Sequence, residues 1–149
     1  MKLLLDTNIL SRLCHPVREE NRPVAEWLSD LLESSTYTVY VPEIADYETR
    51  RGLLHVALRS GRSITRSIER LDQLGESLDY LPLTKATMRR AAYLWAKTRS
   101  LGRPTAADEA LDGDVILAAQ ALEISGVVVT ENVRHLAPLA PTYRWHEVP

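Results

Sequence analysis

The chain is poor in cysteine and in long apolar runs. Its 149 residues include a single cysteine, Cys14, which excludes an internal disulfide framework and fits a reducing cytoplasm. No apolar run approaches the roughly 20 residues of a membrane-spanning helix, so we expect no membrane partner. No charged leader or cleavage site precedes the first apolar segment, which we expect to be a core strand and not a signal peptide. These absences favour a cytoplasmic protein.

The signatures of several catalytic classes are also missing. There is no glycine-rich phosphate loop and no nucleophile elbow. The 4 histidines are scattered without the spacing of zinc ligands. Repeats, low-complexity tracts and long linkers are absent, and we expect one domain over residues 1–149. A hydrophobic content of 45% and a net charge of −2 describe an ordinary globular domain without a global basic field for nucleic acid.

An acid stands where the first strand should end. Residues 3–5 are all leucine, which indicates a strand buried on both faces, as in parallel sheets. Asp6 follows at the carboxyl end of this strand, and that edge is where open α/β sheets bind ligands. Thr7 and Asn8 can cap a following helix. A carboxylate at this point has either a metal to hold or a turn to stabilise.

Strand and helix patterns alternate along the rest of the chain. Further strands are expected at 38–41, 80–83, 127–130 and 143–148. Helices are expected at 24–34, 43–60, 63–78, 84–100 and 114–124, with a capping box for a short turn at Thr105–Asp108. The alternation favours a parallel sheet with helices on both faces. Several helices in the middle of the chain have no strands between them and are expected to form a lobe beside the sheet.

Glu48 is the second acid of interest. It lies four residues after Ile44, on the apolar stripe of its helix, where a charge must be paired or bind a metal. The competing interpretation is an ion pair with Arg51, three residues later on the same helix. The spacing alone leaves both interpretations open.

Asp114 is the third acid, and it is expected to open an apolar helix that lies flat on the sheet. The competing interpretation is that an acid in the first turn only stabilises the helix dipole. Asp112 has an interpretation of its own as the residue that caps this helix.

The carboxyl ends of parallel strands meet at one edge, so Asp6, Glu48 and Asp114 can converge in one cleft. Three carboxylates repel each other there unless a cation is present. Oxygen ligands of this kind suit Mg²⁺ or Mn²⁺ rather than zinc, and such an ion indicates phosphate chemistry. A phosphatase with an aspartate nucleophile is disfavoured, because it would want a second acid two residues later, where the chain has Asn8.

Four segments resemble blocks of the PIN-domain family, and they occur in the right order. They are Leu5–Leu10 (LDTNIL), Pro42–Leu53 (PEIADYETRRGL), Asp114–Ala119 (DVILAA) and Val129–Arg134 (VTENVR). The group that they resemble most is the VapC-like toxins of type II toxin–antitoxin systems. Each segment is short, but four in order over nearly the whole chain are specific.

The resemblance implies a three-layer α/β/α fold with a parallel sheet of four to five strands, here with the added helical lobe. It implies a Mg²⁺-dependent endoribonuclease, with Mn²⁺ as a substitute, whose catalytic and metal-binding residues are Asp6, Glu48 and Asp114. The family commonly adds a polar or acidic residue after the fourth strand, which corresponds to Asn132, with Asp112 as the alternative. It also implies an RNA substrate, a homodimer and a small antitoxin whose tail enters the acidic groove.

The chain departs from the family pattern after Asn132. Many members continue with an Asp-Phe pair, whereas this chain has His135 and Leu136. The departure keeps a second hypothesis open, a catalytically weak or inactive PIN-like module for RNA binding or assembly. Four arginines close to these segments are expected to hold RNA phosphates, the alternative for each being a solvated or ion-paired side chain: Arg12, Arg50, Arg51 and Arg134.

Overall fold

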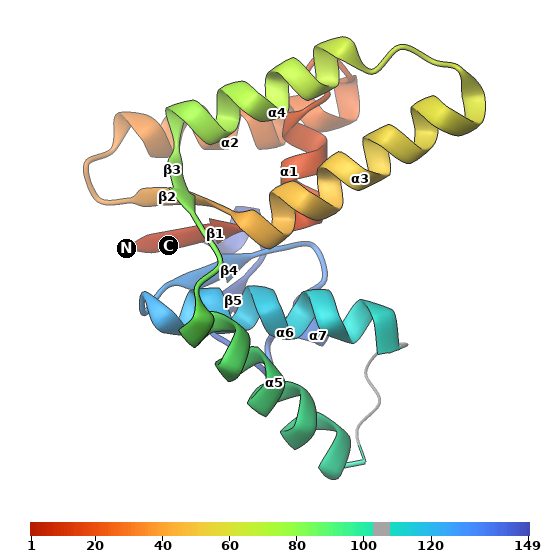
Figure 1. Cartoon of the computed structure of the whole chain (residues 1–149). Helices are drawn as coiled ribbons and strands as arrows, with labels where there is room; N and C mark the ends of the chain where they lie inside the picture. Colours follow the sequence, from red (N-terminus) through yellow and green to blue (C-terminus); the bar gives the residue numbers. More distant parts are fainter. Residues whose placement is uncertain (103–107) are drawn as a thin grey trace.

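A five-stranded parallel sheet forms the centre of the molecule. The computed structural model describes residues 1–102 and 108–149, and within them the strand order is β3-β2-β1-β4-β5 (Figure 1). All four strand pairs are parallel. The strands are β1 (Lys2–Leu5), β2 (Thr38–Pro42), β3 (Asp79–Leu81), β4 (Val127–Val129) and β5 (Thr142–Tyr143). The predicted α/β fold with a parallel sheet is confirmed.

Helices cover both faces of the sheet. They are α1 (Thr7–Leu13), α2 (Arg22–Glu33), α3 (Glu43–Ser60), α4 (Thr65–Ser77), α5 (Lys85–Ser100), α6 (Asp108–Glu123) and α7 (Val133–Leu136), with short 3₁₀ turns η1 (Glu19–Asn21) and η2 (Trp145–Glu147). Residues of α1, α2 and α4 pack on one face, and residues of α6 and α7 pack on the other. Helix α5 packs on α6 (Figure 1). No helix in the described part of the chain is both long and apolar enough to cross a bilayer.

The helices in the middle of the chain belong to these layers and do not form a separate lobe. Helix α4 buries Leu71 and Leu74 in the core on the α1 side, and α5 buries Ala91 against α6 on the opposite side. Each of these helices has an apolar stripe, which is most stable when it is removed from water. Only the far end of the α3–α4 hairpin projects away from the sheet (Figure 1).

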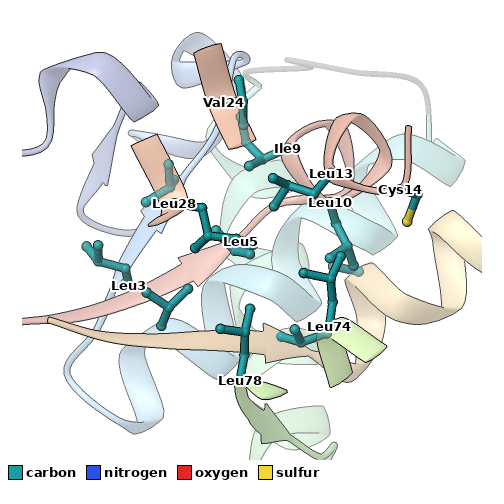
Figure 2. Close-up of a cluster of buried hydrophobic side chains, with 14 of the residues drawn as sticks. Leu3, Leu5, Ile9, Leu10, Leu13, Cys14, Val24, Leu28, Leu74 and Leu78 are labelled. Atoms are coloured by element: carbon teal, nitrogen blue, oxygen red, sulfur yellow. The ribbon is translucent and has the colours of Figure 1, made fainter. Parts of the chain in front are cut away.

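Strand β1 is buried on both faces, as its sequence predicts. Leu3 and Leu5 point into the core that is shared with α1, α2 and α4, part of which is drawn in Figure 2. Leu4 points to the other face and packs with α6. All three leucines have 0% exposure. The strand is therefore held from both sides, which gives the residue that follows it a rigid position.

Two elements differ from the sequence prediction. The last strand covers only Thr142–Tyr143, because its partner β4 ends at Val129 and offers no further hydrogen-bonding edge. Helix α6 begins at Asp108 and not at Asp114, because the apolar run marks only the part of the helix that covers the sheet. Most of the capping box that was predicted at Thr105–Asp108 lies outside the described residues.

The strand order reverses at β1. The chain runs outward from β1 to β2 and β3 on one side, and then adds β4 and β5 on the other. In open α/β sheets, the crevice at such a reversal, beyond the carboxyl ends of the strands, is the usual ligand site. Asp6 and Thr130 directly follow β1 and β4, and the hydrogen bond from Asp6 N to Val129 O (3.0 Å) holds the two ends together.

Candidate active site

Both carboxylate oxygens of Asp6 are held by donors from the chain. Oδ1 accepts a hydrogen bond from the backbone N–H of Thr7 (2.7 Å), which makes Asp6 the N-cap of α1. Oδ2 accepts from the Asn8 side chain (2.8 Å) and from the Thr130 hydroxyl (2.6 Å). The prediction that Thr7 or Asn8 caps this helix is therefore wrong, because the preceding Asp6 already satisfies the first N–H group. Asp6 is only 8% exposed.

A cavity of about 500 Å³ opens at this edge of the sheet. Its lining combines acidic, amide, hydroxyl and basic side chains: Asp6, Thr7, Asn8, Glu48, Arg51, Asp114 and Asn132. Asp6, Glu48 and Asp114 come from three distant parts of the chain and line the same cavity. Asn132, the expected fourth ligand, lines it too, whereas Asp112 does not. We call this space the carboxylate cavity.

Glu48 bridges two helices at the cavity wall. One of its oxygens, Oε2, accepts a hydrogen bond from the Thr7 hydroxyl (2.5 Å), which links α3 to α1. The other, Oε1, lies 3.5 Å from the Arg51 guanidinium. The ion pair expected from the sequence is thus present, and the carboxylate lines the cavity as well. Arg51 is more than half exposed and its guanidinium lies over the Tyr47 ring, 5.1 Å from the centroid.

The apolar stripe predicted for α3 is buried only near its start. Ile44 is buried, but Leu58 is 88% exposed. The reason is that the outer half of the helix projects beyond the sheet (Figure 1). Glu48 therefore lies at the edge of the core and not within it.

Gly113 allows α6 to approach Glu48. A Cβ atom at this position would overlap Glu48 Oε1 and would lie 3.2 Å from Glu48 Cδ. Any larger residue would therefore push the carboxylate away from its place at the cavity wall. Gly113 was not among the predicted site residues, although a glycine inside a helix, between two acids, is a signal of close approach.

Asp114 lies near the end of the second turn of α6, so the helix-dipole interpretation is wrong for it. Burial raises its pKa to about 6, the negative charges of Asp6 and Glu48 add to the rise, and His135 lowers it. Asp112 lies inside the same helix, so its expected role as the N-cap is wrong as well. It is exposed and lines a neighbouring cavity beyond Glu48.

The cavity carries more negative charge than its surroundings neutralise. Burial raises the pKa of Asp6, and the charge of Glu48 raises it further, against hydrogen bonds from Thr130, Thr7 and Asn8 that lower it. Within the described residues, no three Asp, Glu, His or Cys side chains already surround a single metal position. Mg²⁺ suits this arrangement, because it keeps several waters and needs only one or two direct carboxylate ligands. The donor set of carboxylates and an amide is the one such an ion prefers.

The raised pKa of Asp114 predicts how the stability of the metal-free protein depends on pH. The folded state holds a proton up to about pH 6, whereas the unfolded chain releases it near 3.8. Stability contributed by this group therefore falls as pH rises from about 4 to about 6, because the folded state binds more protons over that range. At pH 7 we expect Asp114→Asn to raise the free energy of unfolding by roughly 1 kcal/mol and Tm by about 3 °C. The partial exposure of the side chain keeps this value below the one that the pKa alone would give.

Thermal unfolding in EDTA from pH 4 to pH 7 measures this effect. The control is Asp112→Asn, two residues earlier on the same helix and exposed, which should keep the wild-type slope of Tm against pH. Equal slopes for wild type and Asp114→Asn would contradict the assignment.

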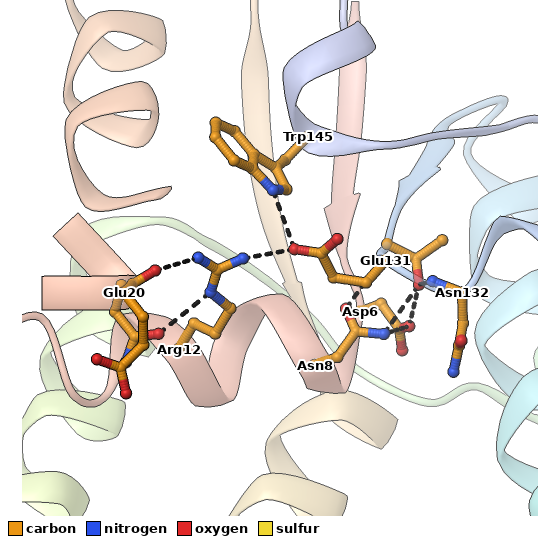
Figure 3. Close-up of polar contacts among 9 residues, drawn as sticks. Asp6, Asn8, Arg12, Glu20, Glu131, Asn132 and Trp145 are labelled. Atoms are coloured by element: carbon orange, nitrogen blue, oxygen red, sulfur yellow. Dashed lines mark hydrogen bonds and ion pairs between the residues drawn. The ribbon is translucent and has the colours of Figure 1, made fainter. Parts of the chain in front are cut away.

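Three of the four predicted arginines form ion pairs: Arg51 with Glu48 at the cavity wall, and Arg12 and Arg50 with other acids. Arg12 pairs with Glu131, donates to Asn21 Oδ1 (3.1 Å) and to the carbonyl of Glu20, and so joins α1 to the loop after β4 (Figure 3). The same Glu131 accepts from the Trp145 indole (3.0 Å). Arg12 thus positions this loop, in agreement with the ion-paired alternative, and each of its three nitrogens donates in these contacts.

Arg50 is also ion-paired, with Asp46 (2.9 Å) and Asp72 (2.8 Å), and it does not line the carboxylate cavity. This agrees with the ion-paired alternative for Arg50. Arg51 lines the cavity, and Arg134 is exposed on α7. Of the four predicted arginines, Arg51 is thus the one that lies beside the carboxylates.

The sequence analysis also missed the residues that orient Asp6. Thr130 donates to Asp6 and accepts from the backbone N–H of Asn132 (2.8 Å), so one hydroxyl connects the two sides of the cavity. Asn8 donates to Asp6 and accepts from the backbone N–H of Glu131 (3.2 Å; Figure 3). Thr130 follows a buried strand, as Asp6 does, and that position was the available signal.

Comparison with known families finds one match that spans most of the chain. The PIN domain family model matches residues 3–137. A search of curated protein sequences finds no match.

Several solved structures share this fold over nearly the whole chain. VapBC2 from Rickettsia felis, bound to a DNA fragment from their promoter, has a TM-score of 0.73 at 16% identity, over 97% of this chain and 99% of that one. FitAcB from Neisseria gonorrhoeae has a TM-score of 0.70 at 22% identity, over 98% and 99%. VapBC-5 from Mycobacterium tuberculosis, a member of the VapBC family of toxin–antitoxin systems, has a TM-score of 0.58 at 17% identity, over 96% of each chain. At these identities the likeness shows a shared fold.

Proposed function

The chain belongs to the PIN-domain family, and from this membership we propose that it is a Mg²⁺- or Mn²⁺-dependent endoribonuclease, the toxin of a toxin–antitoxin pair. The observation that carries the proposal is the carboxylate cavity, in which Asp6, Glu48 and Asp114 meet beside Asn132. Burial raises the pKa values of Asp6 and Asp114, the neighbouring carboxylates raise them further, and a bound divalent cation would relieve both effects.

Asp6 is the proposed central ligand, with Glu48, Asp114 and Asn132 around it. A divalent ion held there would supply an activated water and would stabilise the leaving oxygen of the phosphodiester. The chain itself supplies the orientation, because donors from Thr7, Asn8 and Thr130 hold both Asp6 oxygens. Such preorganisation lowers the cost of arranging the site during the reaction.

Arg51 is the proposed phosphate ligand of the site. Its guanidinium lines the cavity and lies 3.5 Å from Glu48, at a distance where it can exchange that contact for a phosphate oxygen. It is also anchored by the Tyr47 ring. A cation at the rim would counter the repulsion between RNA and the carboxylates.

A small antitoxin and a second copy of the chain are the proposed protein partners. The toxin–antitoxin complexes with the same fold support the antitoxin. Helix α5 exposes Met88, Tyr93 and Trp95, a composition typical of protein interfaces.

Growth arrest on expression, relieved by co-expression of the neighbouring small reading frame, tests the toxin assignment. Unimpaired growth under strong expression would count against it.

The nuclease assignment predicts metal-dependent cleavage. The purified protein should cut a labelled structured RNA in Mg²⁺ or Mn²⁺ and should stop when EDTA is added, with the DNA oligonucleotide of the same sequence as control. Gel analysis of the products over a metal titration measures this. Tight RNA binding without products at any metal concentration would instead support the RNA-binding or assembly module, the second hypothesis that the His135-Leu136 departure keeps open.

A further inference from the structure

A second cavity of about 480 Å³ lies directly beside the carboxylate cavity. It is formed by α1, α3, the start of α4 and the turn after α1, and Glu48 lines both cavities. The two spaces are therefore separated by one side chain. We call the second space the basic cavity, because Arg18, Arg62 and His15 line it and Glu48 is its one lining acid.

The arginines of the basic cavity differ from Arg12 and Arg50. Arg18 and Arg62 are exposed, and neither side chain forms an ion pair with any residue that the structure describes. Their guanidinium groups are thus available to an anion. The bidentate geometry of guanidinium suits phosphate oxygens.

The inner wall of the basic cavity is polar and partly preorganised. The His15 ring is held between the Ser11 carbonyl (3.0 Å) and the Ser67 hydroxyl (3.1 Å), which fixes it between α1 and α4. Thr49 also lines the cavity and is 3% exposed, and its hydroxyl has no hydrogen-bond partner. A buried hydroxyl without a partner is unfavourable, so a small shift that lets it reach a polar ligand in the cavity would be stabilising.

The remaining wall is apolar and comes from Leu53, Val56 and Ile64. A space of this size, with apolar walls and a few polar groups, is typical of sites for small organic groups. A nucleotide has this combination of surfaces, since it joins a flat base and a ribose to an anionic phosphate. Base faces pack on apolar and aromatic groups, and phosphates bind arginine.

We propose that the basic cavity binds the RNA nucleotide next to the scissile phosphodiester, with Arg18 and Arg62 on its flanking phosphate. This assignment rests on the proposed function, because the scissile group is placed in the carboxylate cavity. Glu48, which lines both cavities, then lies between the nucleotide bound in the basic cavity and the scissile bond in the carboxylate cavity.

RNA binding in EDTA tests the proposal without any need for cleavage. The probe is a fluorescent single-stranded decaribonucleotide, titrated with wild type, Arg18→Ala/Arg62→Ala, and the control Arg89→Ala/Arg90→Ala. The control changes net charge equally on α5, where both arginines are exposed. We expect the Arg18/Arg62 variant to raise Kd about tenfold or more and to lower the slope of log K against log salt by about 0.7, the value for one phosphate on a single strand. Equal Kd values for the two double variants would overturn the proposal.

A second pair of variants tests the interior of the cavity. Val56→Glu adds an acid inside the basic cavity, and Leu58→Glu adds the same charge on the same helix at a position that does not line it. We expect Val56→Glu alone to weaken RNA binding. Equal effects of the two would overturn the assignment to this cavity, and loss of antitoxin binding with unchanged RNA binding would assign the cavity to a protein segment.

The outcomes separate this proposal from the nuclease assignment. Arginine-dependent RNA binding by a protein that shows no cleavage in Mg²⁺ or Mn²⁺ would refute the nuclease and keep the binding site. Metal-dependent cleavage with RNA binding that ignores Arg18 and Arg62 would refute the binding site alone.

Discussion

Replacement of Asp6 by asparagine is expected to abolish metal-dependent RNA cleavage while the fold remains. Asp6 is the acid that every part of the site supports, since Thr7, Asn8 and Thr130 all donate to it. Loss of its charge removes the proposed central ligand, and we expect activity to fall by more than about 100-fold, because loss of even a supporting partner of a metal ligand costs about 10- to 100-fold. Asparagine is also a good N-cap, so α1 should keep its start.

The stability of this variant should move in the opposite direction to its activity. Burial raises the pKa of Asp6, which means that the folded state is penalised for holding it ionised at neutral pH. In EDTA at pH 7 we therefore expect the Tm of Asp6→Asn to equal or exceed that of wild type. Circular dichroism melts and a cleavage assay on the same preparation measure both effects, with exposed Asp30→Asn as control. Full cleavage by a folded Asp6→Asn protein would refute the role of Asp6.

Replacement of Gly113 by alanine is expected to reduce cleavage more than about tenfold without unfolding the protein. The added Cβ would overlap Glu48 Oε1, and Glu48 can leave by rotating its flexible side chain. The carboxylate would then lose its place at the cavity wall and its hydrogen bond from Thr7. Alanine inside a helix is favoured over glycine by about 1 kcal/mol, so the free energy of unfolding should not fall.

Gly75→Ala is the matched control for this effect. Gly75 also lies inside a helix, and a Cβ there would meet Tyr80 at an ordinary contact distance of 3.6 Å. We expect it to share any gain in helix stability and to keep full activity. Unchanged cleavage by Gly113→Ala would show that the position of Glu48 at the cavity wall is not needed. A large fall in Tm would show instead that the backbone of α6, and not Glu48, had to move.

Much of this site can be read from the sequence because its signals are local. Three consecutive leucines indicate a strand buried on both faces, and an acid directly after such a strand has its place at the ligand-binding edge of a parallel sheet. Three consecutive valines likewise indicate strand β4, and the position of Thr130 directly after it was the signal that could have identified this residue. The end of helix α3 can be read from Gly61, which has a φ of 64° and forms the C-cap.

Pairings between distant residues were decided only by the tertiary structure. No local pattern shows that Arg12 would bind Glu131, 119 positions later, or that Arg50 would bind Asp72. Likewise, the start of α6 at Asp108 removes the capping role expected for Asp112, because polar turns beyond the sheet leave no apolar pattern.

The parallel α/β architecture and the place of Asp6 can be read from the sequence, since strand burial and the position of a residue directly after a strand depend on neighbours in the chain. Glu48 and Asp114 lie within helices, and the sequence points to them only through the expected convergence at one sheet edge and the family resemblance. The tertiary structure decided which arginines remain available for an anion, and it decided that Gly113 must be small for Glu48 to reach the cavity. The arginine pairings and the contact between Gly113 and Glu48 both join segments that are far apart in the sequence. The distance between packed helices such as α3 and α6 is set by side chains from different parts of the chain.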